Sequence, residues 1–292
     1  MRIPASFTGT VALKPTYGLV PMYPSSPYGT LAHAGPHART VTDAAMLLDV
    51  IAAPDWRDWS ALPPPGRSFL EALDDGVPGM RIALSLDLGF GDNDPEVSAA
   101  VRAAADVLAG AGAEVEEVDL GLSDPVDAFH VLWFTGAAKV VQPFGPDALD
   151  RVDPGLAAAI RSYGLRPTAS DYLDATAVRM DLGRRFALLH QTYDVLLTPT
   201  MPIAAFPAGQ PSPDGWLSDL WTSWTPYTYP FNMTQQPALS VSCGLTTDRR
   251  PVGLQVIGPR HGDAVVLRVG RTYEALTPWH REVPTLLDHR DR

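Results

Sequence analysis

The sequence predicts an α/β domain, and three observations carry that prediction. Strand-like and helix-like segments alternate along the chain, without an internal repeat or a low-complexity linker. The 292 residues are 46% hydrophobic and 19% charged, which supplies a large globular core and argues against disorder. Proline, with 29 residues, is about twice as frequent as its usual share of roughly 5%, so we expect many ordered, non-repetitive loops.

The first helix expected from hydrophobic spacing covers residues 41–52. Thr40 precedes it and Asp43 follows three residues later, which predicts a capping box with Asp in place of Glu. We expect this helix to pack on a large apolar surface, because its apolar residues share one stripe. They are Val41, Ala44, Ala45, Leu48, Ile51 and Ala52.

Residues 82–120 are typical of a right-handed βαβ unit. A strand is expected where Ile82, Leu84 and Leu86 alternate, and Asp94 and Pro95 are predicted as the N-cap and first residue of a helix. That helix should run to the glycines at 110 and 112, and a second strand is expected over residues 113–120. The helical stripe consists of Val97, Ala100, Val101, Ala104 and Leu108.

The second half of the chain predicts a helix, a strand, a long loop and a closing hairpin with a helix. Residues 172–189 have helical spacing, and a strand over 195–198 is expected to end at Pro199. Residues 199–230 contain seven prolines and several aromatic residues, so this segment is either functional or hides a missed element. Strands over 239–243 and 252–257 then precede a helix with its inward positions at Val266, Val269, Tyr273 and Leu276.

Charge and composition argue against several classes of protein. The net charge is −11 and basic residues are scattered, which disfavours nucleic-acid binding. The apolar runs are too short for a membrane span, and the first ten residues have no apolar core of a signal peptide. The single cysteine, Cys243, cannot form an internal disulfide. We therefore expect a cytoplasmic protein.

Generic catalytic patterns do not locate a reactive centre. The sequence has no G-x-S-x-G, H-E-x-x-H or P-loop motif, and residues 89–94 lack the third glycine of a dinucleotide loop. A thiol pair of Cys243 and His261 is disfavoured, because Cys243 lies in an apolar strand pattern. The histidines lack metal-site spacing, so we expect surface or hydrogen-bonded roles and no metal. They are His33, His37, His130, His190, His261, His280 and His289.

Several segments carry a resemblance to a known family. Residues 2–18, beginning Arg2-Ile3-Pro4 and ending in Lys14-Pro15-Thr16-Tyr17-Gly18, are similar to the segment that closes and follows a G-G-S-[hydrophobic]-R motif. Residues 35–49 match a G-P-x-x-R-T-V-x-D-A-A helix entry, and residues 193–200 match a Y-D-V-L-L-T-P-T strand. Residues 230–258 and 277–280 resemble the closing block. The chain thus resembles amidase signature enzymes, most weakly between residues 121 and 165.

The resemblance implies a mixed β-sheet flanked by helices on both faces, of which residues 1–292 form a partial domain without its amino-terminal part. It also implies hydrolysis of a carboxamide to a carboxylate and ammonia or amine, by serine, cis-serine and lysine. No cofactor or metal is implied. The nucleophilic serine of the motif stands two residues before Arg2, so we expect no catalytic residue within the chain. Neither Lys14 nor Ser6 is expected to substitute, because Lys14 is typical of a loop or strand edge and Ser6 of a core-edge hydroxyl.

Four residues are predicted to bind substrate. Arg2 would lie beside the nucleophile and orient it or a substrate carboxylate, or would simply be solvated at a free terminus. Tyr227, Phe231 and Asn232 fall where the resemblance places a pocket wall. Their alternative roles are packing for the two aromatic residues and turn capping for Asn232.

Three hypotheses for the chain remain open. The first is an incomplete or truncated amidase, inactive alone, whose full-length form acts on a small-molecule amide and could form a homodimer. The second is a non-catalytic scaffold or fragment that needs a partner to cover unpaired strand edges. The third is the amidase subunit of a tRNA-dependent amidotransferase, which the acidic composition disfavours.

Overall fold

A seven-stranded mixed β-sheet is the centre of the molecule. The computed structural model describes residues 1–216 and 218–283, and the strands lie in the order β2-β1-β6-β7-β5-β3-β4. β3 runs parallel to both β4 and β5, while the remaining neighbours are antiparallel. The strands are β1 (Val11–Lys14), β2 (His37–Ala38), β3 (Arg81–Leu84), β4 (Glu114–Glu117), β5 (Val195–Pro199), β6 (Ala238–Leu245) and β7 (Pro251–Ile257).

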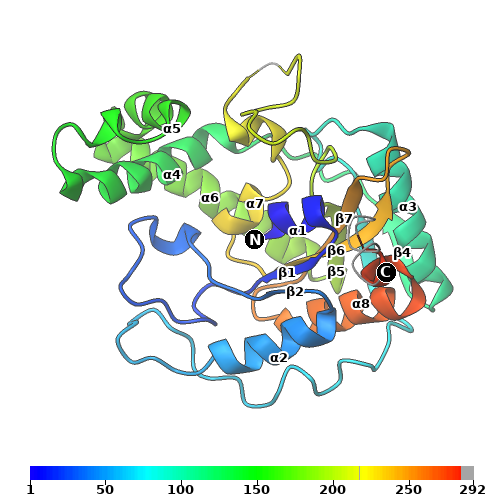
Figure 1. Ribbon diagram of the computed structural model, residues 1–292. Helices are drawn as coiled ribbons and strands as arrows, with labels where there is room; N and C mark the ends of the chain where they lie inside the picture. The colour runs from blue at the N-terminus through cyan, green and yellow to red at the C-terminus, as the bar shows by residue number, and fades with distance from the viewer. Residues whose placement is uncertain (217, 284–292) are drawn as a thin grey trace, which may run out of the picture.

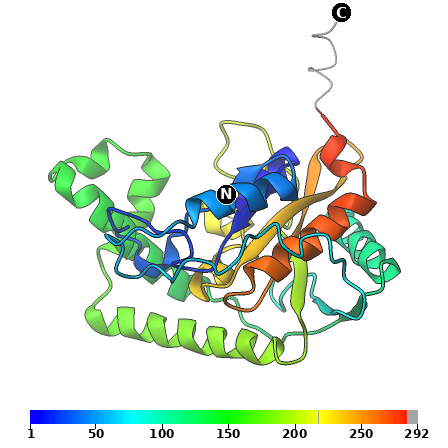
Figure 2. The same ribbon diagram turned by 90° about the horizontal axis from the view of Figure 1, so that it is seen from below.

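Helices cover both faces of the sheet, as the resemblance implies (Figure 1). One face packs on α2 (Val41–Ile51), α3 (Pro95–Gly110) and α8 (Asp263–Leu276), which share one apolar cluster with residues such as Ile82 and Leu239. The other face carries α1 (Arg2–Thr8), α4 (Val126–Val141), α6 (Ala169–Leu189) and α7 (Tyr229–Met233). A short helix, α5 (Pro154–Ala159), lies beside α4 in Figure 1, and α6 extends along one side of the molecule in Figure 2.

The short helix α1 crosses close to the sheet at one glycine. A Cβ placed on Gly253 would lie 2.5 Å from Ser6 Oγ and 3.0 Å from Thr200 Oγ1, so no side chain fits at this position of β7. Ser6 is only 2% exposed, which confirms its expected place as a hydroxyl at the core edge. This contact seats the start of α1, and with it Arg2, over the centre of the sheet.

Several predicted elements are confirmed with changed ends. Thr40 Oγ1 accepts the backbone N–H of Asp43 at 3.1 Å, and Asp94 Oδ1 accepts that of Glu96 at 2.8 Å, so both N-caps are as expected. The capping box predicted at Thr40 is only half formed, because this is the one hydrogen bond of the box that the structure shows. β3 ends at Leu84 and excludes Leu86. Its neighbours β4 and β5 leave Ile82, Ala83 and Leu84 all buried rather than alternating.

One predicted strand end is confirmed and one predicted inward position is wrong. β5 ends at Pro199, as expected, although the strand includes this proline, which lies opposite Leu254 of β7. Leu276 does not face inward, since it is the last residue of α8 and is 56% exposed.

The proline-rich segment contains the start of α7 and a 3₁₀ turn at Trp221–Trp224, so a missed element is part of its explanation. In the described part of the chain, every helix is too short or too polar to cross a bilayer.

Candidate active site

A buried arginine defines the candidate site. Arg2 begins α1 and is 5% exposed, so the expectation that it could be solvated is wrong. Its Nη1 donates to Gln255 Oε1 at 2.6 Å, and its Nη2 donates to Thr228 O at 2.8 Å and Asn232 Oδ1 at 2.5 Å. Burial lowers the pKa of Arg2 to about 9. Arg2 is therefore held by neutral acceptors from β7 and α7.

The acceptors are themselves fixed in orientation. Gln255 Nε2 donates to Thr198 Oγ1 at 3.0 Å and to Tyr227 O at 2.8 Å, which leaves its oxygen for Arg2. Asn232 Nδ2 donates to Leu31 O at 2.9 Å, so its oxygen also faces Arg2. No carboxylate of the described residues lies within ion-pair distance of Arg2. A buried guanidinium without a counter-ion strongly favours a ligand oxygen that carries negative charge.

Arg2 borders a cavity of about 330 Å³ with aromatic walls. Phe129 stacks on Tyr229 with ring centroids 4.9 Å apart, and Trp221 meets Phe129 edge-on at 5.9 Å. Tyr229 Oη donates to Asp124 Oδ1 at 2.6 Å, and burial raises the pKa of Tyr229, which stays a neutral phenol. The remaining wall residues are Met1, Ile3, Lys14, Leu31, Ala32, His33, Trp133, Thr228 and Asn232.

Lys14 lies in the cavity wall, where sequence reasoning did not place it. Lys14 is the last residue of β1, so it lies at the end of a strand. It is only 1% exposed, however, and is therefore buried and not in an exposed loop. Its Nζ donates to Gln236 O and to Pro15 O, the latter at 3.1 Å. Burial and the nearby charge of Arg2 hold the pKa of Lys14 well below its usual range. Within the described residues, no serine hydroxyl is hydrogen-bonded to a lysine.

Of the four residues predicted to bind substrate, Arg2 and Asn232 line the cavity. Tyr227 and Phe231 are fully buried in the apolar cluster beneath it. Tyr227 Oη donates to Asn93 Oδ1 at 2.7 Å, and Phe231 packs on Phe186 at 5.1 Å between ring centroids. Tyr227 reaches the site through its backbone carbonyl and Gln255. A substrate contact by either aromatic side chain stays a prediction.

Sequence reasoning missed Gln255 as a partner of the site, although a signal was present. Gln255 is the one side chain able to form strong hydrogen bonds in the run from Val252 to Ile257, and it is fully buried. A buried amide in an apolar strand needs polar partners, so its presence indicates a polar site against the sheet. Its pairing with Arg2 joins residues 253 positions apart.

The expected roles of Cys243, His130 and His190 agree with the structure. Cys243 is buried in β6, and burial raises the pKa of its thiol, as expected for packing. His130 bonds Thr222 and His190 bonds the carbonyl of Tyr193. His289 lies outside the described residues. Among those described, no group of three or more His, Cys, Asp or Glu side chains is arranged to hold a metal ion.

The mixed sheet covered on both faces, with a buried arginine beside an aromatic-walled cavity, defines an α/β protein with a candidate small-molecule site. The family model described as Amidase matches residues 1–267, and the chain belongs to this family. An acylamidase of Rhodococcus erythropolis is 35% identical over 297 residues, covering 97% of this chain and 61% of the relative.

Two further comparisons support the family. A glutamyl-tRNA(Gln) amidotransferase subunit from Thermosynechococcus vestitus is 35% identical over 324 residues, covering 98% of this chain and 64% of the relative. The crystal structure of a bacterial aryl acylamidase, an amidase signature enzyme, aligns with a TM-score of 0.84 and 27% identity, covering 96% of this chain and 61% of that one. The chain thus spans less than two thirds of the length of these relatives.

Proposed function

We propose that this chain supplies the substrate-binding wall of an amidase that hydrolyses a carboxamide to a carboxylate and ammonia or amine. The observation that carries the proposal is the buried guanidinium of Arg2 beside the aromatic-walled cavity. A carbonyl oxygen that gains negative charge during attack is the ligand that a buried cation without a counter-ion favours. The aromatic walls suit an amide with an apolar or aromatic acyl group.

The proposed chemistry needs a nucleophile and a base that the described residues do not bring together. The ammonium group of Lys14 donates to two backbone carbonyls. Among the described residues, no serine hydroxyl is hydrogen-bonded to it. We therefore propose, as the resemblance implies, that the serine, cis-serine and lysine of the reaction come from chain preceding Arg2. On this proposal the 292-residue chain alone turns over no simple carboxamide.

Binding of benzamide, followed by tryptophan fluorescence, tests the proposal. Trp133 and Trp221 line the cavity, so their emission should change when a ligand occupies it. We expect saturable quenching by benzamide, and no release of ammonia when the chain is purified from a host without amidases. Trp221→Ala should weaken binding at least five-fold. The matched control is Trp56→Ala, since Trp56 is 89% exposed on a loop that does not line the cavity. Ammonia release by the chain, or quenching unaffected by Trp221→Ala, would overturn the proposal.

The amidotransferase subunit is a second candidate, because identity to one such protein equals identity to the acylamidase, 35% in each case. The net charge of −11 favours a small substrate over tRNA. Copurification of the chain with partner proteins and tRNA would reverse this preference.

A homodimer and a cytoplasmic location remain part of the proposal. Trp59, which is 90% exposed, and Trp56 on the same loop offer apolar surface for a second copy, and sedimentation velocity across a range of concentrations tests for it. Cys243 is buried and unpaired, as is usual in a reducing compartment.

A further inference from the structure

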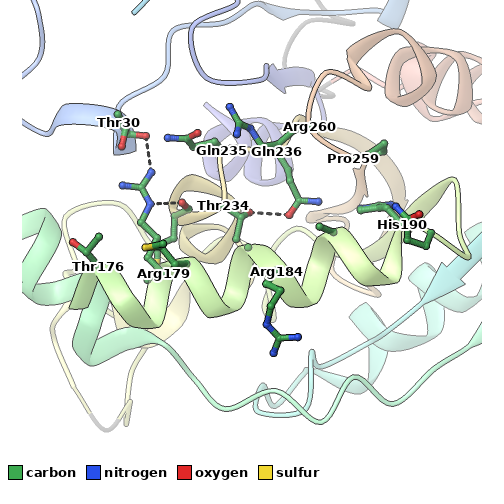
Figure 3. A pocket seen from close by; sticks show the side chains of 15 residues that line it. Thr30, Thr176, Arg179, Arg184, His190, Thr234, Gln235, Gln236, Pro259 and Arg260 are labelled. Carbon is green, nitrogen blue, oxygen red and sulfur yellow. Dashed lines mark hydrogen bonds between the residues drawn. The ribbon is translucent and has the colours of Figure 1, made fainter. Parts of the chain in front are cut away.

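A second and larger cavity lies along α6, away from Arg2. Its volume is about 680 Å³, and it shares no wall residue with the cavity at Arg2. Residues 233–236 and 259–260 form the side opposite α6 (Figure 3). The end of α7 separates the two cavities, since Asn232 lines the first and Met233 lines the second. The volume falls within the range of roughly 300–1,000 Å³ that is typical of small-molecule sites.

The charge of this cavity is opposite to that of the whole chain. Three arginines and no acidic residue line it, although the chain has a net charge of −11. One of the three, Arg184, is neutralised by Asp181 at 2.7 Å and projects from the other side of α6 (Figure 3). The remaining pair, Arg179 and Arg260, forms no ion pair with any residue that the structure describes.

The two arginines act on the same space. Arg179 donates to two neutral carbonyls, Met233 O and Thr30 O, the latter at 3.2 Å, so its charge is uncompensated. Burial lowers the pKa of Arg179, and the positive charge of Arg260 lowers it further. Arg260 is exposed, with no hydrogen bond to another described residue. Two like charges that face one cavity favour an anion between them, because the anion relieves their repulsion.

The rest of the wall adds an apolar surface. Met180 and Ala187 lie seven residues, or about two turns, apart on one face of α6, and Met233 at the end of α7 lines the same cavity. Methionine adapts its shape to flexible apolar groups. We propose that this cavity binds a small organic anion, with its carboxylate on Arg179 and Arg260 and a short apolar chain along Met180 and Ala187.

Octanoate is the probe for this site, and isothermal titration calorimetry is the measurement. We expect one saturable site, at least ten-fold tighter for octanoate than for acetate, whose affinity falls as salt is raised. Arg260→Gln should weaken octanoate at least ten-fold without loss of folding, because this side chain forms no hydrogen bond to another described residue. Ala187→Trp should also weaken octanoate binding, because the indole ring fills the apolar part of the cavity. The fold should tolerate this substitution, since Ala187 is exposed.

Arg102→Gln is the matched control, since it removes one positive charge from α3, outside the cavity. Octanoate should bind this variant as it binds the unchanged chain. The proposal is overturned if octanoate does not bind, if acetate binds equally well, or if Arg260→Gln and Arg102→Gln behave alike. Binding of benzamide at Arg2 is a separate event, so either result stands without the other.

Discussion

At the scale of the residue, Arg2 shows which features of the candidate site could be predicted from the sequence and which could not. The resemblance placed this arginine beside the reacting centre, and the structure buries it at the cavity wall. Its three acceptors come from residues 228, 232 and 255, more than 220 positions along the chain. Residue order cannot predict that convergence, because it depends on α1 packing over Gly253. The candidate Asn232 could be predicted from the family motif. The polar character of Gln255 in an apolar strand was visible in the sequence, but its pairing with Arg2 required the fold.

Replacement of Arg2 by lysine should destabilise the fold. A lysine offers a point charge in place of the planar fork, so Gln255 Oε1 and Asn232 Oδ1 cannot both keep a donor. We expect Arg2→Lys to lower the free energy of unfolding by about 2–3 kcal/mol. Chemical denaturation measures this change.

The matched control for this substitution is Arg102→Lys, at an exposed ion pair with Glu117. An exposed pair contributes about 0–1 kcal/mol, so its loss should hardly register. Equal effects of the two substitutions would contradict the assignment of Arg2 as a buried, triply bonded cation.

At the scale of the element, helices with a clear apolar stripe and a capping residue could be predicted, and others could not. α3 begins at Pro95 after Asp94, as expected from the sequence. α4, in contrast, was not predicted, because its sequence is apolar on most sides and lies where the resemblance is weakest. α1 was also missed. Its seven residues include Pro4 and are too short for a periodic pattern, and tertiary contacts with β6 and β7 hold them helical.

The N-cap of α3 gives a prediction at this scale. Asp94→Ala removes the acceptor for the N–H of Glu96, so we expect a loss of about 1 kcal/mol in the free energy of unfolding. Asp106→Ala, at an exposed position in the C-terminal half of the same helix, is the control and should be neutral or slightly stabilising. Thermal unfolding compares them. A smaller loss for Asp94→Ala than for Asp106→Ala would contradict the cap.

At the scale of the whole molecule, folding encloses several histidines that water would surround in the unfolded chain. His33, His130 and His190 are partly or fully enclosed, and burial is the main cause of the lowered pKa in each. His33 Nδ1 donates to Leu31 O at 2.9 Å, next to the candidate site. An imidazole that stays neutral in the fold but takes a proton when unfolded couples stability to pH.

Stability should therefore fall as the pH drops below about 6.5, the unperturbed pKa of histidine, because the unfolded chain then binds more protons than the folded one. We expect His33→Asn to reduce this dependence by about 1 kcal/mol per pH unit between about pH 6.5 and 5.5. Denaturation at a series of pH values measures it. His37→Asn is the control, because the ring of His37 is exposed. An unchanged slope in His33→Asn would show that the imidazole takes up its proton in the fold.

The two outermost strands of the sheet limit how the molecule can assemble. β2 has only two residues, and β4, with the sequence Glu114-Val115-Glu116-Glu117, presents mostly carboxylates. The two residues of β2 offer too little backbone for a strand of another molecule to pair with. The acidic edge strand β4 repels the β4 strand of a second copy. A second copy or a partner must then recognise this protein through its side chains, and growth of the sheet from one molecule into the next is disfavoured at both ends.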